Sequence, residues 1–214
     1  HENKNDSTIL INLKSWYDSN LKSYADKLAD VIYCGDKSTY KSTSYNPWSI
    51  GTIGTNYGVG TNVNYYSATS RFVASGGNPG GTGPTLVCPK DNLGGKLSKY
   101  TANDTINGNG KLNGYKIGLL SADEVVFAGG VRESTNNSYY LYENTSSSWW
   151  WTMSPSHFNS NDAAFFVCVS TTGGIEDSWK TGTTYAVRPA ISLIPTITIS
   201  AGTGTSSDPF IISS

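Results

Sequence analysis

The sequence predicts an α+β domain, and three observations lead to this fold class. Apolar residues recur at helical spacing through most of residues 7–33. A strand-to-helix unit with clear start and stop signals lies at 115–130. Strand-like runs separated by polar loops then extend from residue 138 to residue 193. With 214 residues, the chain is one domain, with or without appendages, and can bury a sizeable core.

The N-terminal part is the most helical. Apolar residues from Ile9 to Ile32 follow the spacing of one helix face. Ser7 is a candidate N-cap, and the sequence Asp-Ser-Asn at 18–20 is a candidate break between two helices. We therefore expect a helical part over 7–33.

Residues 35–114 form the least regular part of the sequence and are rich in Gly, Ser, Asn and Tyr. The clearest loop is SGGNPGGTG at 75–83, and PTLVCP at 84–89 reads as a short strand. This insert is too long for a simple connection. It is either a functional excursion or irregular structure packed on the domain.

The segment 115–130 has the clearest boundaries. A strand runs into Ser121, and Glu124 three residues later completes a capping box. Gly129 follows where the glycine just past a helix end is expected. Four strand-like runs come next, at 138–143, 148–154, 163–171 and 186–193, with polar loops at 156–162 and 172–184. The tail at 196–214 reads as two short strands joined by a Gly/Ser turn.

The three cysteines predict one disulfide and one buried thiol. Cys34 and Cys88 end apolar segments beside turn residues, a setting that suits a disulfide and an oxidising compartment. Cys168 lies inside an apolar run and reads as a buried free thiol. Without a CxxC pair and with only two histidines, a structural zinc site is not expected.

Composition narrows the function classes. Only 14% of residues are charged, so Ser, Thr, Asn, Gly and Tyr must cover most of the surface. This palette suits extracellular β-rich proteins and resembles antibody binding loops, although a loop-rich β protein of any function would also have it. The net charge of −1 without a basic stripe argues against nucleic-acid binding. No apolar run approaches the roughly 20 residues that span a bilayer, and any membrane contact would require an N-terminal anchor or pilin helix that this sequence lacks.

Catalytic motifs are missing from the sequence. His157 is the only internal histidine and lies in a polar loop, where a contact or surface role is expected. The carboxylates of Asp162, Glu176 and Asp177 would suit calcium, but solvated loop charges are the simpler interpretation. We therefore expect a non-enzymatic protein without a resident cofactor, calcium being the one candidate. Asp123 and Glu124 are interpreted as helix N-terminal residues that interact with the dipole.

Recognition is the remaining candidate activity. Trp149, Trp150 and Trp151 are consecutive, and since side chains alternate along a strand, Trp149 and Trp151 share one face while Trp150 takes the other. Trp150 and Trp151 are expected to pack, and for Trp149 burial is a serious alternative to ligand contact. Trp179, in a polar surround, is the hardest aromatic to place in a core, unless it folds back as a lid. The candidate ligand-binding residues are Trp149, Ser156, His157, Phe158, Asn159, Asn161, Asp162, Glu176, Asp177, Trp179, Lys180 and Tyr185.

Three segments, IGLLSADEVVFAGG, YYLYENTSSSWWWTMSP and YAVRPAISL, together resemble the C-type-lectin-type domains of Firmicute and prophage surface proteins. These domains are related in fold to formylglycine-generating-enzyme-like domains. The matching frame residues are Trp150, Trp151, Ser154, Pro155, Val187, Arg188, Pro189 and Leu193. The front half resembles pilin-like members, and GTGTSSDPF resembles the tail motif of many bacterial surface proteins.

The resemblance implies a C-type-lectin-like fold with a small twisted antiparallel sheet, two or three helices and long irregular loops. It predicts one domain over 1–195, with its core at 115–193, and a hairpin-like tail at 196–214. Several relatives are variable proteins of diversity-generating retroelements. The enzymatic branch uses reactive cysteines, and no matching pair lies near Cys168.

Two functions follow. The first is an exposed binding or adhesion domain on a cell surface, with a protein or glycan ligand on a cell or phage, built from the loops at 156–162 and 175–185. The second is a structural, pilin-like subunit of a pilus or surface layer, which the N-terminal amphipathic helix favours. Both functions are extracellular.

Overall fold

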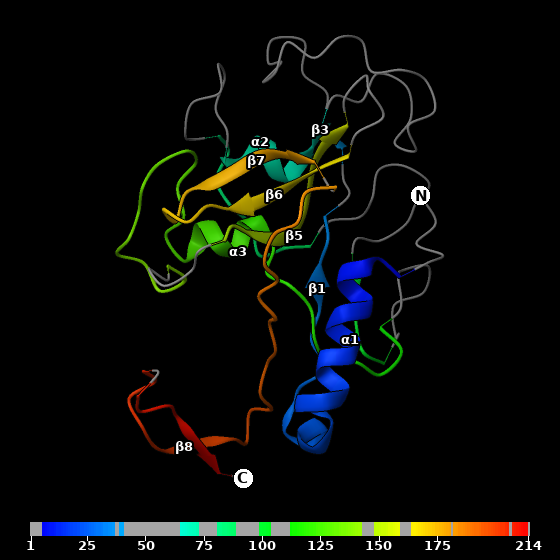
Figure 1. Ribbon diagram of the computed structural model, residues 1–214, viewed down its shortest axis with the longest axis vertical. Helices are drawn as coiled ribbons and strands as arrows, with labels where there is room; N and C mark the ends of the chain where they lie inside the picture. The colour runs from blue at the N-terminus through cyan, green and yellow to red at the C-terminus, as the bar shows by residue number, and fades with distance from the viewer. Residues whose placement is uncertain are drawn as a thin grey trace.

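The computed structural model shows a mixed α+β domain built around one five-stranded sheet (Figure 1). The residues that it describes are 6–36, 39–40, 65–72, 81–88, 99–103, 112–142, 148–158, 164–180, 182–205 and 207–213. The predicted fold class is confirmed at the level of α+β.

The main sheet is antiparallel, in the order β2-β3-β5-β6-β7. Its strands are β2 (Thr39–Tyr40), β3 (Tyr65–Tyr66), β5 (Trp150–Phe158), β6 (Ala164–Val169) and β7 (Ile175–Lys180). Two antiparallel pairs stand apart from it, β1 (Tyr33–Cys34) with β4 (Lys99–Tyr100) and β8 (Thr198–Ala201) with β9 (Ile211–Ser213). The insert therefore supplies β2 and β3, two strands of the main sheet.

The N-terminal part is helical as far as Lys27, whereas the predicted helical part extended to residue 33; residues 28–32 are not helical and Tyr33 begins β1. The Ser7 side chain caps α1 (Thr8–Asn20) by accepting a hydrogen bond from the Leu10 N–H at 3.2 Å. The chain then breaks at Leu21 into the 3₁₀ helix η1 (Lys22–Lys27), so the predicted division into two helices is confirmed.

The predicted capping box is also present, at α3 (Ala122–Phe127). The Ser121 hydroxyl accepts from the Glu124 N–H, and the Glu124 carboxylate accepts from the Ser121 N–H. Gly129 follows with φ +115°, the left-handed conformation expected just past the end of the helix. A further short helix, α2 (Ser67–Phe72), lies in the insert.

The two faces of the sheet bury two separate core clusters. One cluster contains Trp150 with residues of α2, α3 and β6, whereas the other contains Trp151 and Cys168 with residues of α1. Trp149 packs against the second cluster, on the face of Trp151. The predicted alternation of the three tryptophans is confirmed, and so is the buried free thiol of Cys168.

Four predicted strands are wrong. Residues 84–88 form bends, 138–142 form bends and turns, and both 186–193 and the segment before Ser121, 115–120, make only isolated bridges. In 84–88 the backbone is held by a disulfide and a side-chain carboxylate instead of a ladder, as described below. Arg188 is held by its side chain, since its Nη1 donates to the Leu141 carbonyl at 2.7 Å.

The tail hairpin β8–β9 projects away from the rest of the chain at the end of an extended connection (Figure 1). All of its strand residues are exposed. Among the described residues, no helix is long and apolar enough to cross a bilayer.

Candidate functional site

An aromatic stack brings together two of the predicted ligand-binding residues. Trp149 and Tyr185 stack with ring centroids 5.6 Å apart and planes 28° apart. The Trp151 ring also contacts the Tyr185 ring, with centroids 4.9 Å apart and planes at 45°. Trp149 and Tyr185 are half-buried, whereas Trp151 is buried. We call these three residues the aromatic stack.

Backbone pairing explains why residues so far apart in the sequence meet here. Ala186 donates its N–H to the Trp149 carbonyl at 2.8 Å, and Trp151 donates to the Ala186 carbonyl at 3.2 Å. This parallel bridge places Tyr185 beside the start of β5. Burial raises the pKa of Tyr185, and the negative charge of Glu176 adds to the effect, so the phenol stays neutral at physiological pH.

The predicted loop at 156–162 begins later than expected, because β5 continues through Phe158. His157 pairs with Phe165 and Phe158 pairs with Ala164 on β6, so their backbone groups are used in the sheet. Ser156 is fully buried, a position that excludes direct contact with a ligand. Polar side chains concealed this part of the strand from sequence reasoning, since a ladder needs only backbone groups.

The predicted loop at 172–184 is likewise mostly strand. Strand β7, an edge strand of the main sheet, contains Glu176, Asp177, Trp179 and Lys180. In the pairing with β6, Trp179 is opposite Phe166. The Glu176 side chain is half-buried. The interpretation of these four residues as loop residues is wrong, since pairing with the apolar strand β6 orders a sequence with little strand character of its own.

Three of the candidate residues, Asn159, Asn161 and Asp162, lie outside the described residues. Within the part of the chain that is described, no three His, Cys, Asp or Glu side chains are grouped to hold a metal ion. The calcium site stays a prediction.

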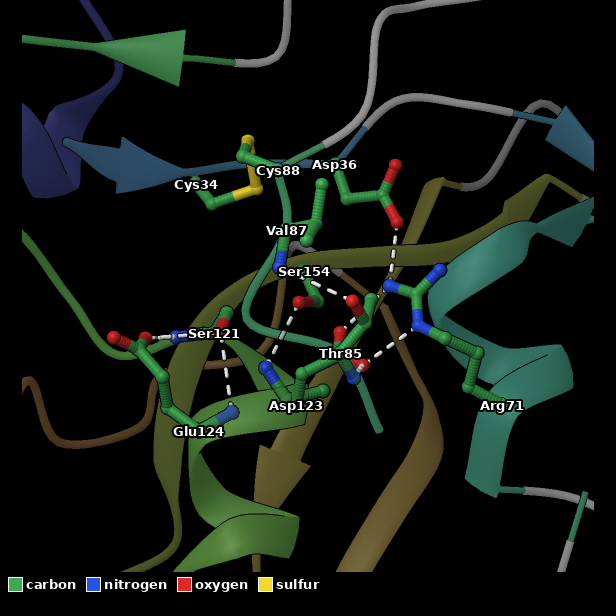
Figure 2. The surroundings of a disulfide bond; sticks show 11 residues. Cys34, Asp36, Arg71, Thr85, Val87, Cys88, Ser121, Asp123, Glu124 and Ser154 are labelled. Carbon is green, nitrogen blue, oxygen red and sulfur yellow. Dashed lines mark hydrogen bonds and ion pairs between the residues drawn. A yellow bond between two sulfur atoms is a disulfide. The ribbon is translucent and has the colours of Figure 1, made fainter. Parts of the chain in front are cut away.

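A second feature, which the sequence reasoning missed, is a pocket of about 280 Å³ beside the disulfide. The predicted Cys34–Cys88 bond is present, with Cα atoms 5.6 Å apart (Figure 2). It joins β1 to the segment 81–88 and forms one wall of the pocket. We call this cavity the disulfide pocket.

A buried ion-pair network lies beside the disulfide (Figure 2), and two of its members, Arg71 and Asp123, line the disulfide pocket. Arg71 donates from Nε and Nη2 to the two carboxylate oxygens of Asp123, both at 2.6 Å, and from Nη2 to Asp36 at 2.5 Å. The side chains of these residues are only 12%, 4% and 1% exposed, in that order. Burial alone would lower the pKa of Arg71, but the hydrogen bonds and charges of the two carboxylates outweigh it and raise the pKa.

The network gives Asp123 a second role, in addition to its predicted place at the N-terminus of a helix. This residue is in the first turn of α3, but its carboxylate is the partner of Arg71 and also accepts from the Thr85 N–H at 2.9 Å. No local sequence pattern predicts an ion pair between residues 52 positions apart. The predicted disulfide was the one sequence feature that could have indicated this site, since it brings the neighbours of Cys34 and Cys88 together.

The rim of the disulfide pocket carries exposed aliphatic side chains and two charges. Ile32, Leu86 and Val87 are 49%, 71% and 75% exposed. Lys99 of β4 and Glu124 of α3 supply the charges. The rim thus combines three aliphatic side chains with one basic and one acidic side chain.

Comparison with known proteins adds one match. Residues 96–195 match a family described as a domain of unknown function, DUF6273. No curated protein and no solved structure matches the chain significantly. The matched range contains both the aromatic stack and α3.

Proposed function

We propose that this chain is a non-enzymatic ligand-binding domain displayed at a bacterial or prophage-determined cell surface, with a C-type-lectin-like fold. The observation that carries the proposal is the aromatic stack. Trp149 and Tyr185, 36 positions apart, present stacked rings that are half-exposed, with the Glu176 carboxylate near enough to affect the Tyr185 phenol. Large rigid aromatic groups beside a polar acceptor are typical of recognition surfaces, for protein and for glycan ligands.

The frame beneath the stack supports this proposal. The Arg188 guanidinium lies over the Trp150 ring at 5.0 Å, and the Ser154 hydroxyl accepts from the Ala122 N–H at 2.9 Å. These three frame residues thereby connect β5 to the 186–193 segment and to α3. A rigid frame lets the adjoining surface vary in sequence without loss of the fold, which a diversified binding protein requires.

The pilin-like alternative was motivated by the apolar face of the N-terminal helix. Leu13 and Tyr17 of α1 are both only 4% exposed and belong to the core cluster of Trp151. The domain's own core therefore accounts for that face, and we favour ligand binding over the structural role.

The test compares Trp149→Ala with Trp16→Ala. Trp16 is 44% exposed on α1 and is outside the aromatic stack, so it controls for the loss of an accessible tryptophan. The probes are a printed panel of bacterial and host glycans and intact bacterial cells. We expect saturable binding by the wild type, a loss of about tenfold or more in Trp149→Ala, and no change in Trp16→Ala.

Near-ultraviolet circular dichroism and thermal unfolding establish whether each variant is folded. If Trp149→Ala is unstable, Trp149→Phe retains a smaller ring and should bind at an intermediate level. Equal binding by all variants, or no saturable binding of the folded wild type to any probe, would refute the proposal.

A further inference from the structure

We propose that the ligand of the aromatic stack is a protein, and that the group held on the stack is an arginine side chain of that protein. This inference rests on the proposed function, because it names the partner of the same site. It is carried by a carboxylate on the same face of the sheet, by the engagement of the described cations elsewhere, and by the nearly parallel planes of two half-buried rings.

Strand register places a carboxylate on the same face as the stack. Trp151 of β5 is opposite Cys168 of β6, and Cys168 is opposite Glu176 of β7. Directly opposite residues of antiparallel strands point to the same face, so Glu176 shares the face of Trp151. Two strand spacings separate these residues, which are therefore about 10 Å apart across the sheet. Burial first, and then the charge of Glu176, raise the pKa of Tyr185, in agreement with this position.

The cations whose side chains the structure describes are engaged elsewhere. Arg188 lies over the ring of Trp150, on the opposite face of the sheet. Lys116 donates to two backbone carbonyls, and Lys99 lines the disulfide pocket. Ion pairs with carboxylates hold the others, which are Lys14, Lys22, Lys27, Arg71 and Arg132. Among the described side chains, the charge beside the stack is therefore the negative charge of Glu176, and a positively charged ligand complements it.

The charge of Glu176 acts through space and does not depend on which other contacts its oxygens make. Because Glu176 is half-buried, water weakens its field less than that of a fully exposed acid. A distance of about 10 Å corresponds to about one Debye length at an ionic strength of about 0.1 M. We therefore expect the binding of a cation on the stack to weaken as salt is added.

The shape of the stack favours a planar cation. The rings of Trp149 and Tyr185 stack with planes 28° apart, so they present ring faces and do not surround a ligand as the aromatic cages for quaternary ammonium groups do. A guanidinium is planar and stacks on aromatic faces, whereas an ammonium is a compact, strongly hydrated charge. The same frame already contains such a pair, since the Arg188 guanidinium lies over Trp150 at 5.0 Å. An arginine side chain therefore suits the stack better than a lysine or a quaternary ammonium group.

The probes are the capped peptide acetyl-Gly-Arg-Gly-amide, its lysine and citrulline analogues, and choline. Citrulline is planar like arginine but uncharged, so it isolates the effect of charge. Binding is followed by chemical-shift titration of the full chain at about 20 mM and about 300 mM salt. We expect the arginine peptide to saturate below about 10 mM at low salt and to bind more weakly at high salt. Each of the other probes should bind about threefold or more weakly than the arginine peptide.

The variants are Glu176→Gln, Trp149→Ala and the control Asp26→Asn. The Asp26 side chain is 70% exposed in η1, outside the stack, so it controls for the loss of one negative charge. Glu176→Gln should reduce the preference for arginine over citrulline to about twofold or less, whereas Asp26→Asn should keep it. Trp149→Ala should weaken the arginine peptide by about tenfold. The comparison of arginine with citrulline on the wild type tests the charge even if Glu176→Gln fails to fold.

The inference is overturned if citrulline, lysine or choline binds as tightly as arginine, if folded Glu176→Gln keeps the full preference, or if the arginine peptide does not saturate the folded wild type. Tighter binding of an uncharged glycan from the printed panel also overturns it, but leaves the proposed function standing. The proposed function fails by a different result, which is equal binding of that panel and of the cells by the wild type and Trp149→Ala, or no saturable binding at all.

Discussion

Loss of the Cys34–Cys88 disulfide should remove about 4 kcal/mol of stability. The two cysteines are 54 residues apart, so the bond closes a long loop in the unfolded chain. In the chain-entropy relation, a loop of this length corresponds to about 14 cal/mol/K, which is about 4 kcal/mol at 25 °C. We expect Cys34→Ala/Cys88→Ala to lose this amount, because its unfolded chain gains the freedom that the bond denies to the wild type.

Urea unfolding at equilibrium measures this loss. With a slope of about 2–3 kcal/mol per M, the midpoint of the double variant should fall by about 1.5–2 M. A reductant should shift the wild type by a similar amount. It should leave the double variant unchanged, since the remaining cysteine, Cys168, is a free thiol. A loss below about 1 kcal/mol would refute the loop-closure reasoning, and a reductant effect on the double variant would show that the thiol contributes.

Four further predictions concern stability. Arg71→Met leaves two buried carboxylates without a cation and should cost about 3–5 kcal/mol in chemical unfolding, so a loss under 1 kcal/mol would contradict the buried network. Tyr33→Phe removes a buried hydroxyl that has no hydrogen-bond partner among the described residues, and it should be neutral or stabilising at pH 7. Burial raises the pKa of Tyr33 above 10.0, so the wild type loses stability as the pH rises beyond 10, and the variant should lose less over that range. Gly173→Ala should cost at least about 2 kcal/mol, because φ is +81° and the new Cβ would lie 2.1 Å from a backbone oxygen, whereas Gly182→Ala meets nothing within 4 Å and should not change the melting temperature. Deletion of 196–214 should leave the melting temperature unaltered, because all strand residues of the tail hairpin are exposed, and a clear drop would show that the tail supports the domain.

The parts of the structure that were predictable from the sequence depend on short-range interactions. Ser7 and Ser121 cap helices because a hydroxyl can reach an N–H three residues later. Trp150 and Trp151 lie on opposite faces because neighbouring side chains in any strand alternate. The disulfide was predicted from cysteines that end apolar segments, although its consequence for the nearby pocket was not.

Strand β7 is an element that short-range interactions did not predict. Its sequence from Ile175 to Lys180 contains two acids, a serine and a lysine, and it was interpreted as a loop. Its order comes from pairing with β6, in which Val167, Cys168 and Val169 are buried as members of the two core clusters. The pairing partner, and not the strand's own composition, decides the conformation.

The sequence by itself determined the α+β class, the helix starts, the disulfide and the two faces of the tryptophan strand, because each depends on residues a few positions apart or on covalent chemistry. Only the tertiary structure decided which distant residues meet. The bridge at Ala186 brings Tyr185 onto Trp149, and 52 residues separate Arg71 from Asp123. Such contacts follow from how the whole chain closes around its core, and no local pattern encodes them.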